Sequence, residues 1–206
     1  MSLRSIFSIG AAVLFFTACA AERWVPMADE AAVASASKNL IDDSSFESPT
    51  IAGGQYGTFK PGARIGPWKV VGVKGDVALV SGSYAVNGYV FTPGCGHQSL
   101  DISDSGAKTA VEQTIGAMAG KHTLSFKVGN IYNPGTFFGK SSTIEVLVNG
   151  KPIFRAVNTH GKGSKRQVWQ SFTTTFSVAS PSTTIEFRNE DPKGDLVNGL
   201  DCIVAR

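Results

Sequence analysis

From residue 39 onward the sequence contains no long segment in which apolar residues recur at the three- and four-residue spacing of a helix. It consists of short runs rich in β-branched and aromatic residues, separated by glycine, proline, asparagine, aspartate and serine. In several runs polar and apolar residues alternate, as at Leu124, Phe126 and Val128, so each strand offers one face to a shared core. The pattern predicts strands at 68–73, 77–80, 98–102, 110–115, 122–128, 143–148, 153–156, 169–178, 183–187 and 200–205. We therefore expect an all-β domain, a β-sandwich.

The turns between these strands are marked by their residues. Asn149 and Gly150 predict a tight hairpin, because both central residues of a type I′ turn need a positive φ. Trp68 and Trp169 begin strands and are expected in the core. Three long irregular stretches remain, at 48–67, 81–97 and 130–141. Loops of this length in a compact domain are usually functional.

The first residues have the pattern of an export signal. Arg4 precedes an apolar run at 6–16, and small residues follow it. Residues 1–19 are predicted to be a signal peptide and residues 20–38 an Ala/Ser-rich linker, which leaves 39–206 as the folded domain. The end of the signal resembles a lipobox, whose Cys19 would carry a lipid anchor. Cleavage after Ala20 is the alternative, and it would release a periplasmic or secreted protein.

Charge and hydropathy restrict the partners. The apolar run at 6–16 is about half the roughly 20 residues that a spanning helix needs, so membrane contact is expected only through a lipid anchor at Cys19. The formal net charge of +3 is too small to indicate a nucleic-acid partner. A local basic loop at 160–166 is expected to be a solvated turn between strands.

Removal of the signal leaves two cysteines, Cys95 and Cys202. An oxidising compartment allows them to form a disulfide if the fold brings their Cα atoms within about 6 Å. Two buried, unpaired thiols are the alternative, and the sequence leaves both open.

The order of several short signatures resembles the domain of unknown function 642 family, which includes exported bacterial proteins of the "choice-of-anchor C" type. The resemblance covers almost all of residues 39–206 and is carried by the segments at 39–41, 45–49, 66–70, 75–77, 98–102, 111–115, 123–126, 169–176 and 198–201. It implies a galactose-binding-like jelly roll and a polysaccharide or cell-wall glycan as partner. It also places Glu47 and Asp201 in signatures near the two chain ends, where this fold commonly holds a structural calcium ion bound by oxygen ligands.

Catalytic motifs are scarce. The three histidines, at 97, 122 and 160, do not have the spacing of metal ligands, and no nucleophile motif accompanies them. A pair of carboxylates for glycoside hydrolysis could come from Glu47, Asp76, Asp101, Glu112 or Asp201, but such acids are more often found at turns and strand ends. We expect a protein that is not an enzyme.

Aromatic residues in the loops favour glycan binding, because aromatic faces stack on sugar rings and polar groups receive the hydroxyls. The sequence offers Tyr132, Phe137 and Phe138 in a glycine-rich loop, and Arg188 and Asn198 as polar partners. Tyr56, Phe59, Tyr84, Tyr89 and Phe91 lie in the other long loops. For any one of these rings the alternative is a packing role, because long loops fold back over the edges of a small sandwich. The prediction is a non-catalytic carbohydrate-binding or cell-wall-binding module of an exported, lipid-anchored bacterial protein; the alternative is a structural or protein-interaction domain of the cell envelope without a glycan ligand.

Overall fold

The computed structural model describes residues 38–206, except 104–107, 133–137 and 193–195. The predicted signal peptide, Cys19 and Phe137 lie outside the described residues, so export and lipidation stay predictions. In the part of the chain that is described, no helix is long and apolar enough to cross a membrane.

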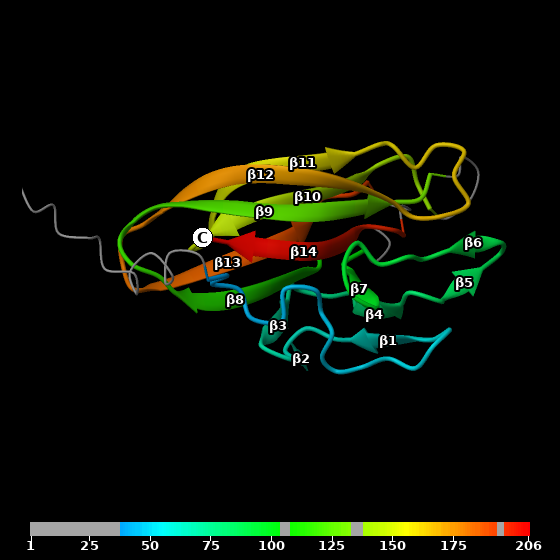
Figure 1. Ribbon diagram of the computed structural model, residues 1–206, viewed down its shortest axis with the longest axis horizontal. Helices are drawn as coiled ribbons and strands as arrows, with labels where there is room; N and C mark the ends of the chain where they lie inside the picture. The colour runs from blue at the N-terminus through cyan, green and yellow to red at the C-terminus, as the bar shows by residue number, and fades with distance from the viewer. Residues whose placement is uncertain (1–37, 104–107, 133–137, 193–195) are drawn as a thin grey trace, which may run out of the picture. The chain divides into compact units, whose positions relative to one another are not determined.

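Two six-stranded antiparallel sheets form the domain (Figure 1). The first sheet has the order β1 (Tyr56–Phe59), β4 (Val77–Ser81), β7 (Gln98–Asp101), β14 (Gly199–Ala205), β9 (Gly120–Asn130) and β12 (Val168–Val178). The second has the order β11 (Lys151–Asn158), β10 (Ser142–Val148), β13 (Ser182–Asn189), β8 (Ala110–Gly116), β3 (Trp68–Val71) and β2 (Arg64–Ile65). A small hairpin joins β5 (Ala85–Val86) to β6 (Tyr89–Val90). This is a jelly-roll β-sandwich, as predicted.

The core lies between the two sheets. Alternate residues of each strand point inward, including Leu124 and Phe126 of β9 and Ile144 of β10, all of which are fully buried. The rings of Phe126 and Phe187 have centroids 5.1 Å apart and join the two sheets at the centre. Burial of these apolar faces is the main favourable contribution to folding.

All the predicted strands are present, with ends shifted by at most two residues. The predicted hairpin is confirmed: Asn149 and Gly150 have φ of 50° and 76°, and β10 pairs with β11 across them. The prediction that 48–67 and 81–97 are irregular throughout was wrong, since they contain β1, β2, β5 and β6.

Trp68 is fully buried, as predicted, but Trp169 is not a core residue. It lies half-buried on the outer face of the first sheet, where its ring crosses Gly129 and Gly199. A Cβ atom at either glycine would be 2.9 Å from the Trp169 ring, so both positions need glycine for this packing. The indole N–H donates to the Thr92 carbonyl at 2.7 Å.

The two ends of the described domain are joined. The amide of Leu40 donates to the carbonyl of Ala205 at 2.9 Å, and the side chain of Asn39 donates to the carbonyl of Ile203 at 2.9 Å. Residues 39–40 therefore lie against the last strand, β14.

Candidate functional site

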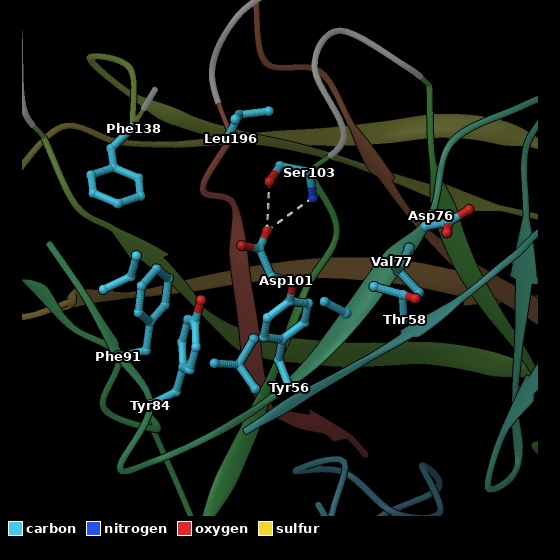
Figure 2. Close-up of a pocket in the computed structure, with 13 residues that line it drawn as sticks. Tyr56, Thr58, Asp76, Val77, Tyr84, Phe91, Asp101, Ser103, Phe138 and Leu196 are labelled. Atoms are coloured by element: carbon cyan, nitrogen blue, oxygen red, sulfur yellow. Dashed lines mark hydrogen bonds between the residues drawn. The ribbon is translucent and has the colours of Figure 1, made fainter. Parts of the chain in front are cut away.

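A pocket of about 480 Å³ opens on the outer face of the first sheet, over β1, β4 and β7 (Figure 2). This volume lies within the range of pockets that bind small molecules. Strand residues form its floor and loop residues form its walls. We call it the aromatic pocket; its lining includes Tyr56, Tyr84, Phe91, Phe138, Asp76, Asp101 and Ser103.

Strand register explains which side chains reach the floor. Ala78 of β4 pairs with Thr58 of β1 on one side and with Asp101 of β7 on the other. Two residues further along the same face, Val80 of β4 pairs with Tyr56 of β1. The intervening residues, such as Leu79, point into the core. Because side chains alternate between the two faces, each of these strands contributes one side to the core and the other to the pocket.

Aromatic rings line one wall in a continuous row. The ring centroids of Tyr56 and Tyr84 are 5.2 Å apart, those of Tyr84 and Phe91 are 5.4 Å apart, and those of Phe91 and Phe138 are 6.1 Å apart. Tyr89 extends the row beyond the pocket, at 5.0 Å from Phe138. Phe91 and Tyr89 are buried in a small core cluster, so the rings of the row that reach the surface are those of Tyr56, Tyr84 and Phe138.

The wall is carried by the β5–β6 hairpin. Asn87 and Gly88 occupy its turn with φ of 52° and 79°, the geometry of the other Asn-Gly hairpin. The backbone N–H of Val90 donates to the Lys165 carbonyl, and the Val90 carbonyl accepts from the backbone N–H of Gln167. Both partners lie at the end of the basic loop. The hairpin is therefore fixed to the sandwich at its second strand.

Asp101 places a carboxyl group in the centre of the lining residues (Figure 2). Its Oδ1 accepts three hydrogen bonds: from the backbone N–H of Ser103 at 3.0 Å, from the Ser103 hydroxyl at 2.7 Å and from the backbone N–H of Asn198 at 3.0 Å. Its Oδ2 accepts no hydrogen bond from the described residues. Burial raises the pKa of Asp101 above its ordinary value, although the hydrogen bonds from Ser103 and Asn198 oppose the shift. One oxygen is thus held in place and the other is open to a ligand.

The structure brings only one of the predicted aromatic ligand residues to this pocket. Phe138 is in the wall. Tyr132 is half-buried outside the lining and pairs with Lys162 of the basic loop through an isolated backbone bridge. Phe137 lies outside the described residues. The loop at 81–97 contributes more of the wall than the loop at 130–141.

The two predicted polar partners lie elsewhere. Arg188 is on the outer face of the second sheet, where its guanidinium pairs with Glu186 at 2.7 Å and with Glu145 at 3.6 Å. Asn198 is fully buried, and its amide donates to Asn189 at 2.8 Å. Its backbone N–H does reach Asp101, so Asn198 positions the pocket carboxyl without contacting a ligand.

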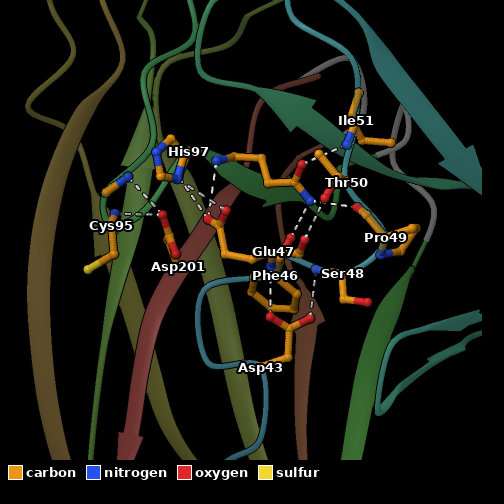
Figure 3. Close-up of polar contacts among 12 residues, drawn as sticks. Asp43, Phe46, Glu47, Ser48, Pro49, Thr50, Ile51, Cys95, His97 and Asp201 are labelled. Carbon is orange, nitrogen blue, oxygen red and sulfur yellow. Dashed lines mark hydrogen bonds and ion pairs between the residues drawn. The ribbon is translucent and has the colours of Figure 1, made fainter.

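Glu47 and Asp201, the predicted calcium ligands, lie close together at the loop 93–97 (Figure 3). Asp201 is fully buried and accepts from the amides of Gly94 and Cys95 at 2.8 and 2.9 Å. Glu47 accepts from the amide of His97 at 2.8 Å. Burial raises the pKa of Asp201 to about 7, with a further contribution from the negative charge of Glu47, against the lowering effect of its amide donors.

A disulfide between Cys95 and Cys202 fastens the same loop to β14, with Cα atoms 5.6 Å apart. The Lys127 ammonium donates to the Gly94 carbonyl at 3.0 Å on the other side. We call residues 93–97 the disulfide loop. The disulfide loop follows the segment that contributes Tyr84 and Phe91 to the pocket wall. That end of the wall is therefore anchored by Glu47, Asp201, Lys127 and the disulfide bond.

The fit to calcium is partial. Glu47 and Asp201 supply negatively charged oxygens at one place, as a hard cation requires. The amides of the disulfide loop already donate to these oxygens, and among the described residues no group of three or more His, Cys, Asp or Glu side chains gathers around a common point. Calcium binding at this pair stays a prediction.

No family model matches the chain, and no curated protein matches it. Solved structures do. The chain is similar to the Stig cyclase FisC from Fischerella sp. TAU, in complex with (3Z)-3-(1-methyl-2-pyrrolidinylidene)-3H-indole, at 16% identity over 81% of this chain and 95% of that chain, with a TM-score of 0.55. It is also similar to the carbohydrate-binding module TmCBM61, in complex with β-1,4-galactotriose, at 16% identity over 82% of this chain and 99% of that chain, with a TM-score of 0.51.

At these identities the likeness shows the fold alone. The chain has the β-sandwich fold of carbohydrate-binding modules, and the same fold occurs in a cyclase. Function therefore has to be argued from the pocket itself.

Proposed function

We propose that this protein is a non-catalytic carbohydrate-binding module and that the aromatic pocket is its glycan site. The observation that carries the proposal is the row of rings from Tyr56 to Phe138 beside the open oxygen of Asp101. Sugar rings present C–H groups on their faces and hydroxyls at their edges. A wall of aromatic faces with a fixed acceptor beside it suits both.

The partner that follows is a polysaccharide, such as a cell-wall glycan. The pocket is open at its Tyr56 end, where the ring is more than half exposed, so a chain of sugar units can extend beyond the pocket there. The β-sandwich fold shared with a module solved with a galactotriose is consistent with this partner.

Tyr56→Ala tests the proposal. The Tyr56 side chain is 53% exposed, so its removal leaves the core unchanged while it shortens the ring row. We expect affinity for the bound polysaccharide to fall by about 1–3 kcal/mol, the range measured for bases stacked on aromatic side chains, with little change in melting temperature. Affinity electrophoresis on plant, bacterial and algal polysaccharides, with thermal unfolding alongside, measures both.

Met118→Ala is the matched control. Met118 is also an exposed apolar residue, at 76%, but it lies in the turn between β8 and β9, outside the pocket lining. Its removal should change neither retention nor stability. Absence of retention by wild type on every polymer would refute glycan binding and favour a structural or protein-interaction domain of the envelope.

One observation favours catalysis as a second candidate function. Burial raises the pKa of Asp101 inside an apolar pocket, which is a common state for a general acid. Asp76 lines the same pocket as a second carboxyl group. Release of shorter products from a bound glycan during prolonged incubation, abolished in Asp101→Asn, would show an enzyme; an unchanged glycan supports the binding module.

A further inference from the structure

One sheet edge of this domain is long and regular. β12 is the last strand of the first sheet, and it pairs with β9 through 11 consecutive residues without a register shift (Figure 1). Among the described residues, the backbone of 169–178 forms hydrogen bonds only with β9. Alternate residues of an antiparallel strand direct their backbone groups to opposite sides. β12 therefore offers a row of unpaired N–H and C=O groups along its outer edge.

The other three sheet edges are protected. β11 carries exposed Lys151, Pro152 and Arg155, and a register shift interrupts its pairing with β10. β1 and β2 have only 4 and 2 residues. Charges, proline, bulges and short strands are the usual means by which proteins prevent edge-to-edge pairing. β12 has none of them, because residues 167–185 contain no charged residue and their one proline, Pro181, follows the strand.

The composition of β12 favours a second copy of the same strand as its partner. In a symmetric dimer, charges near the centre of the edge would face like charges of the second copy. β12 has no charge that would repel its copy. Antiparallel pairing centred on Thr173 uses all 11 residues of both strands, and any other register leaves residues of each strand unpaired.

This register also suits the side chains beside the two-fold axis. Thr173 is exposed on the outer face, and it would lie opposite its counterpart, where the two hydroxyls can form a hydrogen bond. Phe172 points to the inner side and is only half-buried, with its ring centroid 6.3 Å from that of Phe154. The two copies of Phe172 become diagonal neighbours across the axis, within contact distance for aromatic rings. Pairing would bury aromatic surface that the single domain leaves exposed.

We propose that two copies of this chain associate through β12, antiparallel and about a two-fold axis at Thr173. The pairing joins two 6-stranded sheets into one continuous sheet. Backbone hydrogen bonds supply the affinity, as in other cases of strand addition at a sheet edge. The proposal goes beyond glycan binding and does not depend on it, because the aromatic pocket lies over β1, β4 and β7, toward the opposite edge of the sheet.

Sedimentation velocity of the full chain over a range of concentrations tests the association. Wild type should change from monomer to dimer as the concentration rises. Thr173→Lys places two ammonium groups opposite each other at the axis and should weaken dimerisation about fivefold or more. Thr123→Lys is the matched control, because Thr123 is exposed on the same face but belongs to β9, which lies inside the sheet. This control should dimerise as wild type does.

A charge exchange separates loss of pairing from loss of folding. Thr173→Lys and Thr173→Glu should each dimerise weakly alone, whereas an equal mixture should form heterodimers to about the wild-type extent, because opposite charges then meet at the axis. A mixture that associates no better than either variant alone would overturn the proposal. So would a wild type that is monomeric at every concentration, or dimerisation that Thr173→Lys leaves unchanged.

Hydrogen exchange of the wild type gives a test that needs no variant. The amides on the outer edge of β12 should exchange more slowly at concentrations where the dimer forms, because they then donate to the second copy. Amides of β11, the protected edge, should exchange at the same rate at every concentration. Exchange in β12 that does not change with concentration would refute edge pairing.

Discussion

Asp201 shows how one residue can make the fold sensitive to pH. It is fully buried, its carboxyl group accepts backbone N–H groups from the disulfide loop, and Glu47 lies beside it. Burial disfavours the charged form, and its pKa in the folded protein is about 7, against 3.8 for the free side chain. The folded state therefore holds a proton that the unfolded state releases in the same pH range.

We predict that stability decreases as pH rises from about 4 to about 7. A raised carboxyl pKa contributes stability that is fully present below the unfolded value and is lost as pH passes the folded value. The contribution is on the order of a few kcal/mol, since one pKa unit corresponds to about 1.4 kcal/mol. The raised pKa of Asp101 acts with the same sign.

Urea unfolding at several pH values between 4 and 7 measures the slope, which is the change in the free energy of unfolding per pH unit. Asp201→Asn should lose its part of the slope, although the variant is less stable because an amide cannot accept from Gly94, Cys95 and Cys202 together. Glu112→Gln, in the second sheet, should keep the slope. Stability that stays constant or increases between pH 4 and 7 would contradict the prediction.

At the scale of elements, the sequence predicted long strands well and short ones poorly. Strands such as β9 and β12 show alternation over enough residues to be recognised. The strands β2, β5 and β6 have two residues each, too few to show a period. A signal for the β5–β6 hairpin was present in Asn87 and Gly88, the same dipeptide type as at the confirmed hairpin.

The loop after β11 must contain a small residue where it passes the end of β9. A Cβ atom at Gly161 would lie 2.7 Å from the Asn130 carbonyl and 2.8 Å from the Tyr132 nitrogen, both backbone atoms that cannot easily move aside. We predict that Gly161→Ala costs roughly 1–3 kcal/mol of stability, the usual range for overpacking.

Thermal unfolding of Gly161→Ala, compared with wild type, tests this contact. Gly116→Ala is the control, because a Cβ there would be 3.9 Å from the Pro181 carbonyl, an ordinary contact. The control should melt close to wild type. Equal melting of all three proteins would mean that the loop relaxes at no cost.

At the scale of the whole molecule, the pocket could not be located from the sequence. Tyr56, Asp101 and Phe138 are far apart in the chain and meet only because β1, β4 and β7 are neighbours in one sheet and a distant loop covers them. Arg188 and Asn198, the predicted polar partners, lie away from this pocket, since strand ends and loops do not indicate which sheet face a side chain occupies. The sequence indicated that loop aromatics are numerous, and the topology determined which of them line the pocket.

The disulfide links parts of the chain that are 107 residues apart. By the entropy model, such a bridge restricts the unfolded chain by up to about 5 kcal/mol. We predict that reduction lowers the melting temperature of the wild type and leaves Cys95→Ser/Cys202→Ser unchanged. Thermal unfolding with and without reductant measures the difference; two titratable thiols in the unreduced protein would refute the bridge.

The joining of residues 39–40 to β14 has a mechanical consequence. A pulling force applied between the two ends of the domain would act first on the hydrogen bonds of Leu40 and Asn39 to this strand. Once these hydrogen bonds break, the force at the C-terminal end acts on β14. This strand lies between β7 and β9 inside its sheet, and the disulfide joins its Cys202 to Cys95. The disulfide prevents the chain between Cys95 and Cys202 from being extended by this force. Under tension the domain should therefore unfold first at its N-terminal end.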